Sequence, residues 1–319
     1  SKRRSNMSTS VRVGTESTAT LGGRRETLIS RIARQTGRMG LLFPAVALMA
    51  VFLVGPIAYS VYGSLTNAAL SGYKAANPEF VGLENYAELL TSNAFWKAVL
   101  LTVIFVFASA VVGQNILGLA LAMLMRKAPK ILSTLVGGVV VIAWVMPEIV
   151  AAFALYAFFS TDGTLNVLLS YIGLGGTTWL LTFPMFSVIM ANIWRGTAFS
   201  MMVYSAALAE VPPEIQEAAK VDGARGWQRF FFVTLPMIKG SISTNLLLTT
   251  LQTLGVFTLL WVMTGGGPGT QSTTLPVMAY QEAFKNSLIG YGTAIATVTI
   301  VLGALFALVY IRALKPEVD

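Results

Sequence analysis

Six apolar runs, each long enough to cross a lipid bilayer as a helix, constrain what this chain can fold into. A helix needs about 20 apolar residues to span a hydrocarbon layer of about 30 Å. The runs are continuously apolar with glycine and alanine scattered through them, and they lack the short alternating segments of a membrane β-barrel. The sequence therefore predicts an all-α membrane protein with six transmembrane helices in a domain over residues 39–312. The runs lie near residues 39–65, 97–125, 131–159, 184–209, 238–263 and 291–312.

The composition agrees with a membrane location and offers few groups for catalysis. Hydrophobic residues make up 55% of the 319 residues, and charged residues only 11%. The absence of cysteine and histidine excludes disulfides, thiol nucleophiles, Cys/His metal sites and imidazole acid–base catalysis. The sequence also lacks the G-x-x-x-x-G-K-[ST] phosphate loop, so we expect the chain not to hydrolyse ATP by itself. We therefore expect a protein that is not an enzyme and has no metal site or cofactor of its own.

Basic residues are concentrated on one side of the predicted spans. Residues 1–38 form a polar tail with nine of them, and the end of this tail can place a short basic helix on anionic headgroups. The 126–130 turn, the loop after the fourth span and the C-terminal end, including the tail 313–319, carry more. The opposite side has only Lys74, Lys97 and Lys285. Because basic residues favour the cytoplasmic side, we expect both termini and the central loop to be cytoplasmic. This orientation explains the net charge of +8 without a nucleic-acid partner.

The stretch 212–236, between the fourth and fifth spans, mixes acids, bases and aromatics. Its two leading prolines suit the first turn of a helix, and its early acids favour the positive helix N-terminus. Ala218 and Ala219 leave a face with little side-chain bulk, and Gly223 interrupts the helix. A second helical pattern follows. We expect a helix–turn–helix at the membrane surface, with one apolar face and one face open to a partner protein.

These residues resemble the EAA loop of ABC importer permeases, whose pattern is EAA, three residues, G, nine residues and I-x-L-P. Only Val233, in place of isoleucine, departs from the pattern. The resemblance implies a type I ABC importer permease fold in the bacterial cytoplasmic membrane. It also implies a second homologous permease subunit, two cytoplasmic ATPase subunits that bind ATP and Mg, and an external solute-binding protein. The residues that would dock into the ATPase are Glu217, Ala218, Ala219, Asp222, Gly223, Leu235 and Pro236.

Three segments on the external side carry a second resemblance. They are Phe80–Tyr86 (FVGLENY), Gly163–Asn166 (GTLN) and Thr264–Pro268 (TGGGP), and in this order they resemble carbohydrate-type ABC permeases. The resemblance implies that a sugar is transported, in particular a di- or oligosaccharide. Read from the residues alone, each segment is a turn, a loop or a surface helix.

Polar residues within the predicted spans are candidates for a substrate path, because a charge in the bilayer centre costs roughly 2.5–3.5 kcal/mol. Amides and aromatic faces are also what sugar recognition requires. The amides Gln114, Asn115 and Asn245 have an alternative role, which is to join helices by hydrogen bonds. The aromatic residues have the alternative role of facing lipid. The candidates for the path are Glu148, Arg195, Gln252, Asn192, Trp194 and Phe257.

Glu148 and Arg195 lie at similar predicted depth on consecutive antiparallel spans. We expect them to be paired or to share one polar cluster, which would offset the cost of burying each charge. The alternatives are that Arg195 snorkels towards the membrane surface or lines a wet cavity, and that Glu148 is protonated and hydrogen-bonded to a backbone carbonyl. A secondary transporter that uses this pair is a rival to the ABC permease. A membrane-embedded enzyme is a weaker rival, because the spans lack clustered acid–base groups.

Overall fold

The computed structural model describes residues 43–313, and within this range the fold is helical apart from one isolated bridge between Thr66 and Phe80. The predicted N-terminal tail, with its interfacial helix, and the tail after residue 313 lie outside the described residues. The chain divides into two compact units, residues 1–56 and 57–319. In the first unit, residues 43–56 are helical and none is buried. They belong to an apolar helix, Phe43–Ser64, which includes η1 (Ala50–Val54) and α2 (Gly55–Ser64).

The second predicted span is a single helix of 35 residues, Asn93–Lys127. The Ser92 side chain accepts a hydrogen bond from the Phe95 N–H at 3.3 Å, which caps the first turn. Pro129, which cannot continue the helix, separates it from the next one. The segments of this helix are α5 (Asn93–Phe105), the π-helical η2 (Val106–Gln114) and α6 (Asn115–Lys127).

The third predicted span is broken near its middle and the fifth in its last third, which corrects the expectation of continuous helices. Pro147 lacks an N–H and separates α7 (Lys130–Val145) from α8 (Glu148–Phe159). Gly255, Val256 and Phe257 separate α15 (Lys239–Leu254) from α16 (Thr258–Thr264). Continuous hydropathy hides both breaks, because the interrupting residues are themselves apolar or small.

The predicted number of six spans is not confirmed by the length and composition of the helices. Four helices of the described chain are long and apolar enough to cross a membrane, or five if a helix pair bent by 70°, Gly226–Met237 with Lys239–Leu254, counts as one span. The fourth predicted span is α11 (Pro184–Ala209), whose 26 residues suffice in length. Its Asn192, Arg195 and serines lower its mean hydropathy. The last span is α18 (Ile289–Ala313).

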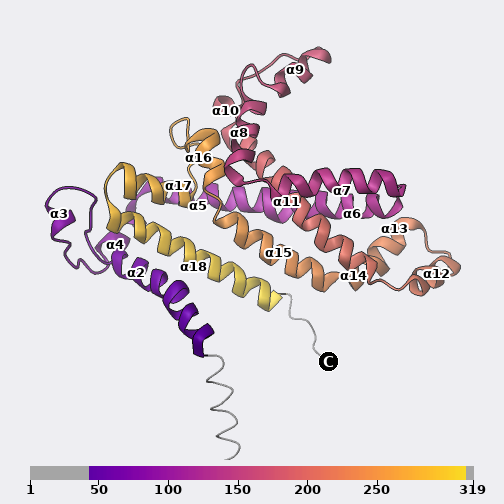
Figure 1. Ribbon diagram of the computed structural model, residues 1–319, viewed down its shortest axis with the longest axis horizontal. Coiled ribbons are helices and arrows are strands. Elements are labelled where there is room, and N and C mark those ends of the chain that lie inside the picture. Colours follow the sequence, from indigo (N-terminus) through magenta and orange to yellow (C-terminus); the bar gives the residue numbers. More distant parts are fainter. Residues whose placement is uncertain (1–42, 314–319) are drawn as a thin grey trace, which may run out of the picture. The chain divides into compact units, whose positions relative to one another are not determined.

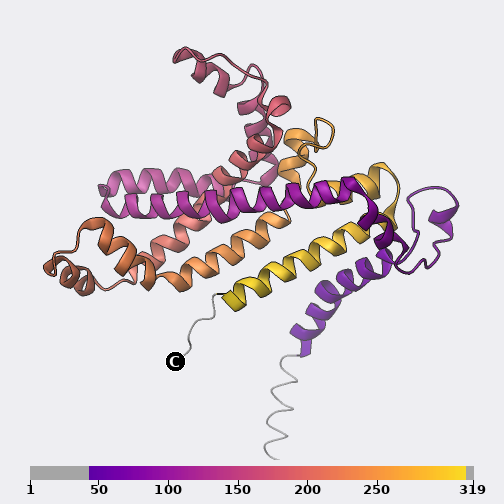
Figure 2. The ribbon, with the colours of Figure 1, turned by 180° about the vertical axis from the view of Figure 1, so that it is seen from behind.

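The helices of the second unit pack around α11, which contacts α6, α7, α8, α15 and α16. Figures 1 and 2 show α6 and α7 running side by side, with α11 passing obliquely next to them. The approach of α6 to α11 depends on Gly118, because a Cβ there would overlap Ser200. Small residues at such crossings are typical of membrane helices. One buried apolar cluster includes Phe105, Val188 and Leu259, and another includes Tyr204 and Leu208.

Short helices connect the long ones. The side chain of Asn85 donates to the carbonyls of Ser64 (2.7 Å) and Thr66 (2.9 Å), and that of Asn166 donates to the carbonyls of Thr161 and Thr177 (2.8 Å each). The asparagines of two of the three external segments therefore have structural roles. The connecting elements are α3 (Tyr73–Ala76), α4 (Glu84–Thr91), α9 (Thr164–Tyr171), α10 (Trp179–Thr182), α12 (Pro213–Val221), α13 (Gly226–Arg229), η3 (Phe230–Thr234), α14 (Leu235–Met237), α17 (Leu275–Tyr280) and η4 (Gln281–Lys285).

Candidate functional site

Residues 212–236 form the expected helix–turn–helix. Helix α12 ends at Val221, and Gly223 follows two residues later with a φ of 80°, a left-handed conformation that other residues reach only with strain. The Ala224 N–H donates to the Ala219 carbonyl at 3.0 Å and so closes the turn. Helix α13 then begins with a one-sided cap in which the Arg225 N–H donates to the Gln228 side chain at 2.7 Å.

This helix–turn–helix presents most of its predicted docking residues to the outside. Figure 1 shows α12 and α13 at the end of the bundle where α6 and α7 turn into each other. The side chain of Gln216 on α12 donates to the hydroxyl of Thr234 on η3 at 3.0 Å, which ties the two arms together. Val221, at 86% exposure, and Trp227 add apolar surface. The predicted residues Glu217, Ala218, Asp222, Gly223 and Pro236 are exposed, whereas Ala219 and Leu235 are half-buried.

Glu148 joins three helices at the breaks in the third and fifth spans. It is the first residue of α8, where a carboxylate is favoured by the positive end of the helix dipole. Its Oε1 accepts a hydrogen bond from the backbone N–H of Leu259, in the first turn of α16, at 3.2 Å. Its Oε2 lies 3.9 Å from Nη2 of Arg195 on α11. The two side chains are therefore paired, as predicted, although at the long end of the ion-pair range.

The environment of this pair is partly open. The side chains of Arg195 and Glu148 are 26% and 29% exposed. Among the described residues, Nε of Arg195 has no hydrogen-bond partner although it is buried. Glu148 accepts a hydrogen bond from a backbone N–H, and within the described part of the chain it donates none to a backbone carbonyl. The arrangement offers a polar point at the helix breaks, where a hydroxyl group of a substrate could be bound.

The other predicted path residues are scattered. Phe257 stacks on Trp261 with ring centroids 5.7 Å apart, and Tyr280 lies 4.9 Å from Phe257. Trp194 is 43% exposed, and Gln252 is also exposed, without a hydrogen bond to any described residue. The structure therefore brings together Glu148, Arg195 and the helix that follows Phe257, but it does not bring Trp194 or Gln252 to them through any recorded contact.

Sequence reasoning named Phe257 and Trp261 as aromatic faces but missed the rest of the aromatic cluster around Trp261. Tyr280, Phe284 and Lys285 follow the fifth span in a segment predicted as an external connection. The Nζ of Lys285 lies 4.5 Å from the Trp261 ring centroid, a cation–π contact. The spacing of Tyr280 and Phe284 at i and i+4 was the available signal, since it places two rings on one helix face. Flat aromatic faces of this kind suit sugar rings.

Asn192 belongs to a buried hydrogen-bond network instead of an open path. Its side chain is 3% exposed and donates to Ser109 Oγ at 2.8 Å and to Thr253 Oγ1 at 3.3 Å. Gln114 donates to the backbone carbonyl of Asn192 at 3.0 Å. These contacts join η2, α11 and α15. In this structure Asn192 therefore joins helices, and its place on a substrate path stays a prediction.

A second buried hydrogen-bond network joins α6, α11 and α15. The amide of Asn245 donates to Asn115 Oδ1 at 2.8 Å and to Ser200 Oγ at 2.9 Å, and the Tyr204 hydroxyl donates to Asn115 Oδ1. The alternative role of Gln114, Asn115 and Asn245 as residues that join helices is therefore confirmed.

The fold and the helix–turn–helix together define the class of protein. The described chain combines apolar helices, two broken spans, a polar junction at the breaks and an exposed segment 212–236, which are the features expected of a membrane transport component. The family described as "Binding-protein-dependent transport system inner membrane component" matches residues 114–319. The match covers more than half of the chain, and the chain therefore belongs to this family of multi-pass membrane proteins.

Curated relatives match along nearly their whole length. The chain is 31% identical over 290 residues to the trehalose/maltose transport system permease protein MalF of Thermococcus litoralis, which covers 89% of this chain and 96% of the relative. It is 33% identical over 285 residues to the sulfoquinovosyl glycerol transport system permease protein SmoG of Agrobacterium fabrum, with coverage of 87% and 90%.

Solved structures show the same fold. A chain from the crystal structure of a bacterial ABC transporter involved in the import of the acidic polysaccharide alginate superposes with a TM-score of 0.75 at 23% identity. The match covers 92% of this chain and 99% of that chain. The predicted type I ABC importer permease fold is thereby confirmed, despite the corrected helix boundaries.

Proposed function

We propose that this chain is a transmembrane permease subunit of an ATP-driven importer for a sugar, in particular a di- or oligosaccharide. The observation that carries the proposal is the exposed helix–turn–helix of residues 212–236 in a chain that belongs to the binding-protein-dependent transport family. The relatives are transport proteins for trehalose/maltose and for sulfoquinovosyl glycerol, which supports a carbohydrate substrate. A secondary transporter that uses Glu148 and Arg195 has no comparable support.

The proposed partners follow from this role. Two cytoplasmic ATPase subunits bind ATP and Mg and receive the segment 212–236, while this chain contributes no cofactor. A second homologous permease subunit completes the transmembrane path. An external solute-binding protein delivers the sugar, and an alginate importer solved with its periplasmic binding protein supports this partner. Both termini and the segment 212–236 face the cytoplasm of the bacterial cell, in the cytoplasmic membrane.

In the proposed mechanism the segment 212–236 transmits movement. Closure of the ATPase pair on ATP shifts the docked α12 and α13, and the spans re-orient between an outward-open and an inward-open state. Glu148 lies where α8, α11 and α16 meet, so relative motion of these helices has to change its contacts with Arg195 and Leu259. The half-open polar junction and the aromatic cluster at Trp261 are the proposed points of contact with the sugar.

Reconstitution tests this function. The chain is assembled with its second permease and its ATPase subunits, inserted into vesicles, and supplied with the binding protein and radiolabelled trehalose or maltose. We expect uptake that needs both ATP and the binding protein. Uptake driven by a proton or sodium gradient without ATP would contradict the proposal and favour a secondary transporter.

A further inference from the structure

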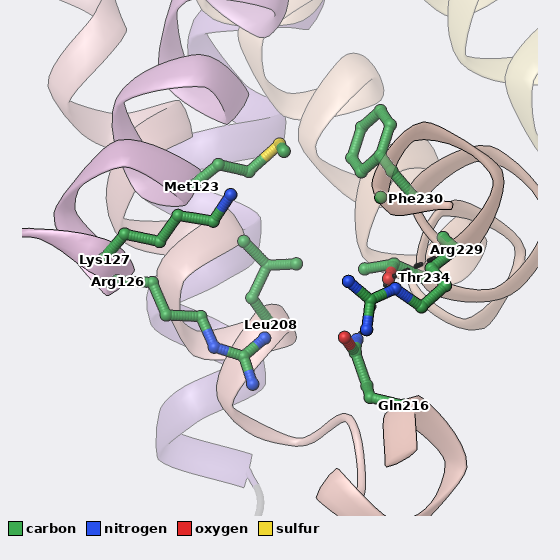
Figure 3. A pocket seen from close by; sticks show the side chains of 9 residues that line it. Met123, Arg126, Lys127, Leu208, Gln216, Arg229, Phe230 and Thr234 are labelled. Carbon is green, nitrogen blue, oxygen red and sulfur yellow. Dashed lines mark hydrogen bonds between the residues drawn. The ribbon is translucent and has the colours of Figure 1, made fainter. Parts of the chain in front are cut away.

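A pocket of about 360 Å³ lies where α6 and α11 end beside the helix–turn–helix. Its volume falls within the range of about 300–1,000 Å³ that is usual for sites of small ligands. Figure 3 shows Arg126 and Lys127, from α6, on one side of the gap, and Arg229, from α13, on the other. The polar ends of all three side chains are directed into the gap. We call this site the cationic pocket.

The charge of the cationic pocket is unbalanced. Three of the nine residues that line it are basic and none is acidic. Within residues 43–313, none of the three basic side chains of the pocket lies within ion-pair distance of a carboxylate. The ion pair between Arg195 and Glu148 lies outside this pocket. Like charges around one pocket repel each other, and a bound anion removes this repulsion.

We propose that the cationic pocket binds a phosphate group. The planar guanidinium groups of Arg126 and Arg229 match the geometry of phosphate oxygens, and Lys127 adds a third charge. Two sources share this chemistry, the headgroup of an anionic phospholipid and a soluble phosphate. Met123, Leu208 and Phe230 give the pocket an apolar part that suits the glycerol and first methylenes of a lipid. Basic pockets between transmembrane helices are known to take lipid headgroups.

A phosphate in this pocket would connect two parts of the chain. Arg126 and Lys127 belong to a transmembrane helix, whereas Arg229 belongs to the segment 212–236, and Gln216 and Thr234 hold the arms of that segment together beside the pocket. The anion would therefore hold α13 to the end of α6. A ligand that binds only the folded protein raises its melting temperature, so the melting temperature measures binding of the anion.

The test uses the full-length chain, purified with its partner subunits in detergent and washed free of lipid. Short-chain phosphatidylglycerol, short-chain phosphatidylcholine and inorganic phosphate are titrated separately while the melting temperature is recorded. The pocket variant carries both Arg126→Gln and Arg229→Gln. It is compared with a control variant that carries both Lys130→Gln and Lys239→Gln. The second pair changes the net charge equally at exposed positions outside the pocket. Melting without ligand and the elution volume show whether each variant is folded.

We expect phosphatidylglycerol to raise the melting temperature saturably. The pocket variant should weaken this binding by about 25-fold, since it removes two basic side chains and each one beside an anionic headgroup is worth roughly a factor of five. The control variant should bind like the original protein, and Arg126→Lys with Arg229→Lys should retain most of the affinity. The same pattern with inorganic phosphate supports a soluble phosphate as the ligand. Loss of binding in both Gln variants alike, or no saturable response to either anion, would overturn the proposal.

Discussion

A single carboxylate connects the two broken spans. Glu148 begins α8, accepts a hydrogen bond from the first turn of α16 and lies 3.9 Å from Arg195 on α11. Each contact alone is modest, because the pair is long and partly exposed to water, where ion pairs are worth about 0–1 kcal/mol. Together they place one negative charge at the meeting point of three helices.

A double-mutant cycle tests whether the charges of Glu148 and Arg195 interact. Glu148→Gln, Arg195→Ala and the double variant are compared for melting temperature and for transport in vesicles. Because removal of either partner leaves the other without its counter-charge, we expect the double variant to lose less than the sum of the single losses. We expect a coupling energy of about 0.5–1 kcal/mol. Additive losses would show that the two charges do not interact.

Helix breaks are the part of the fold that the sequence predicted least well. The apolar runs located the helices, because the cost of burying polar groups in lipid dictates that pattern. Pro147 was visible in the third run, but the apolar residues around it kept the run continuous. Gly255 was a still weaker signal of a helix break. Because the break before α16 was not predicted, the contact between Glu148 and the Leu259 N–H could not be foreseen. The depth of Glu148 and Arg195 could be counted from the span ends, and their pairing was predicted.

The segment 212–236 was more predictable than the path through the membrane. Prolines, alanines and Gly223 act locally, so their spacing determines the helix–turn–helix without knowledge of the rest of the fold. Asn192 shows the opposite case. Its partners Ser109 and Thr253 lie 83 and 61 residues away along the chain, so only tertiary packing decides whether it faces a path or a neighbouring helix.

Two glycines allow a matched test of the contact between α6 and α11. A Cβ at Gly118 would overlap Ser200 and approach the Met201 backbone, whereas one at Gly138 on α7 would meet no heavy atom within 4 Å. We expect Gly118→Ala to destabilise the protein by about 1–3 kcal/mol through overpacking. Gly138→Ala should leave stability unchanged or raise it by up to about 1 kcal/mol, since alanine favours the helix. Thermal unfolding of both variants in detergent measures the difference, and equal melting temperatures would contradict the close contact.

The whole molecule works, in this account, as one moving part of a larger assembly. The segment 212–236 is exposed at one end of the bundle, and the polar junction at Glu148 lies within the spans. In the proposed function the energy comes from the ATPase partners, and the sequence of this chain has no phosphate loop of its own.

The purified chain alone is therefore expected to show no ATP turnover above the background of an empty-vector preparation. Addition of the ATPase subunits and the second permease should restore hydrolysis, and the binding protein should stimulate it. A phosphate-release assay measures each mixture. Hydrolysis by the isolated chain would contradict the assignment of all ATP chemistry to its partners.

The ratio of sugar imported to ATP hydrolysed is the most direct test of coupling through residues 212–236. Gly223 is the residue to change, because a β-branched side chain strains its left-handed turn by roughly 1–2 kcal/mol. Gly240→Val is the control, since a Cβ added at Gly240 would meet no heavy atom within 4 Å. In vesicles containing the full complex, we expect Gly223→Val to insert normally but to lower the ratio by about tenfold, the equivalent of 1.4 kcal/mol. Gly240→Val should leave the ratio unchanged. A Gly223→Val complex that imports sugar with the original ratio would contradict the account.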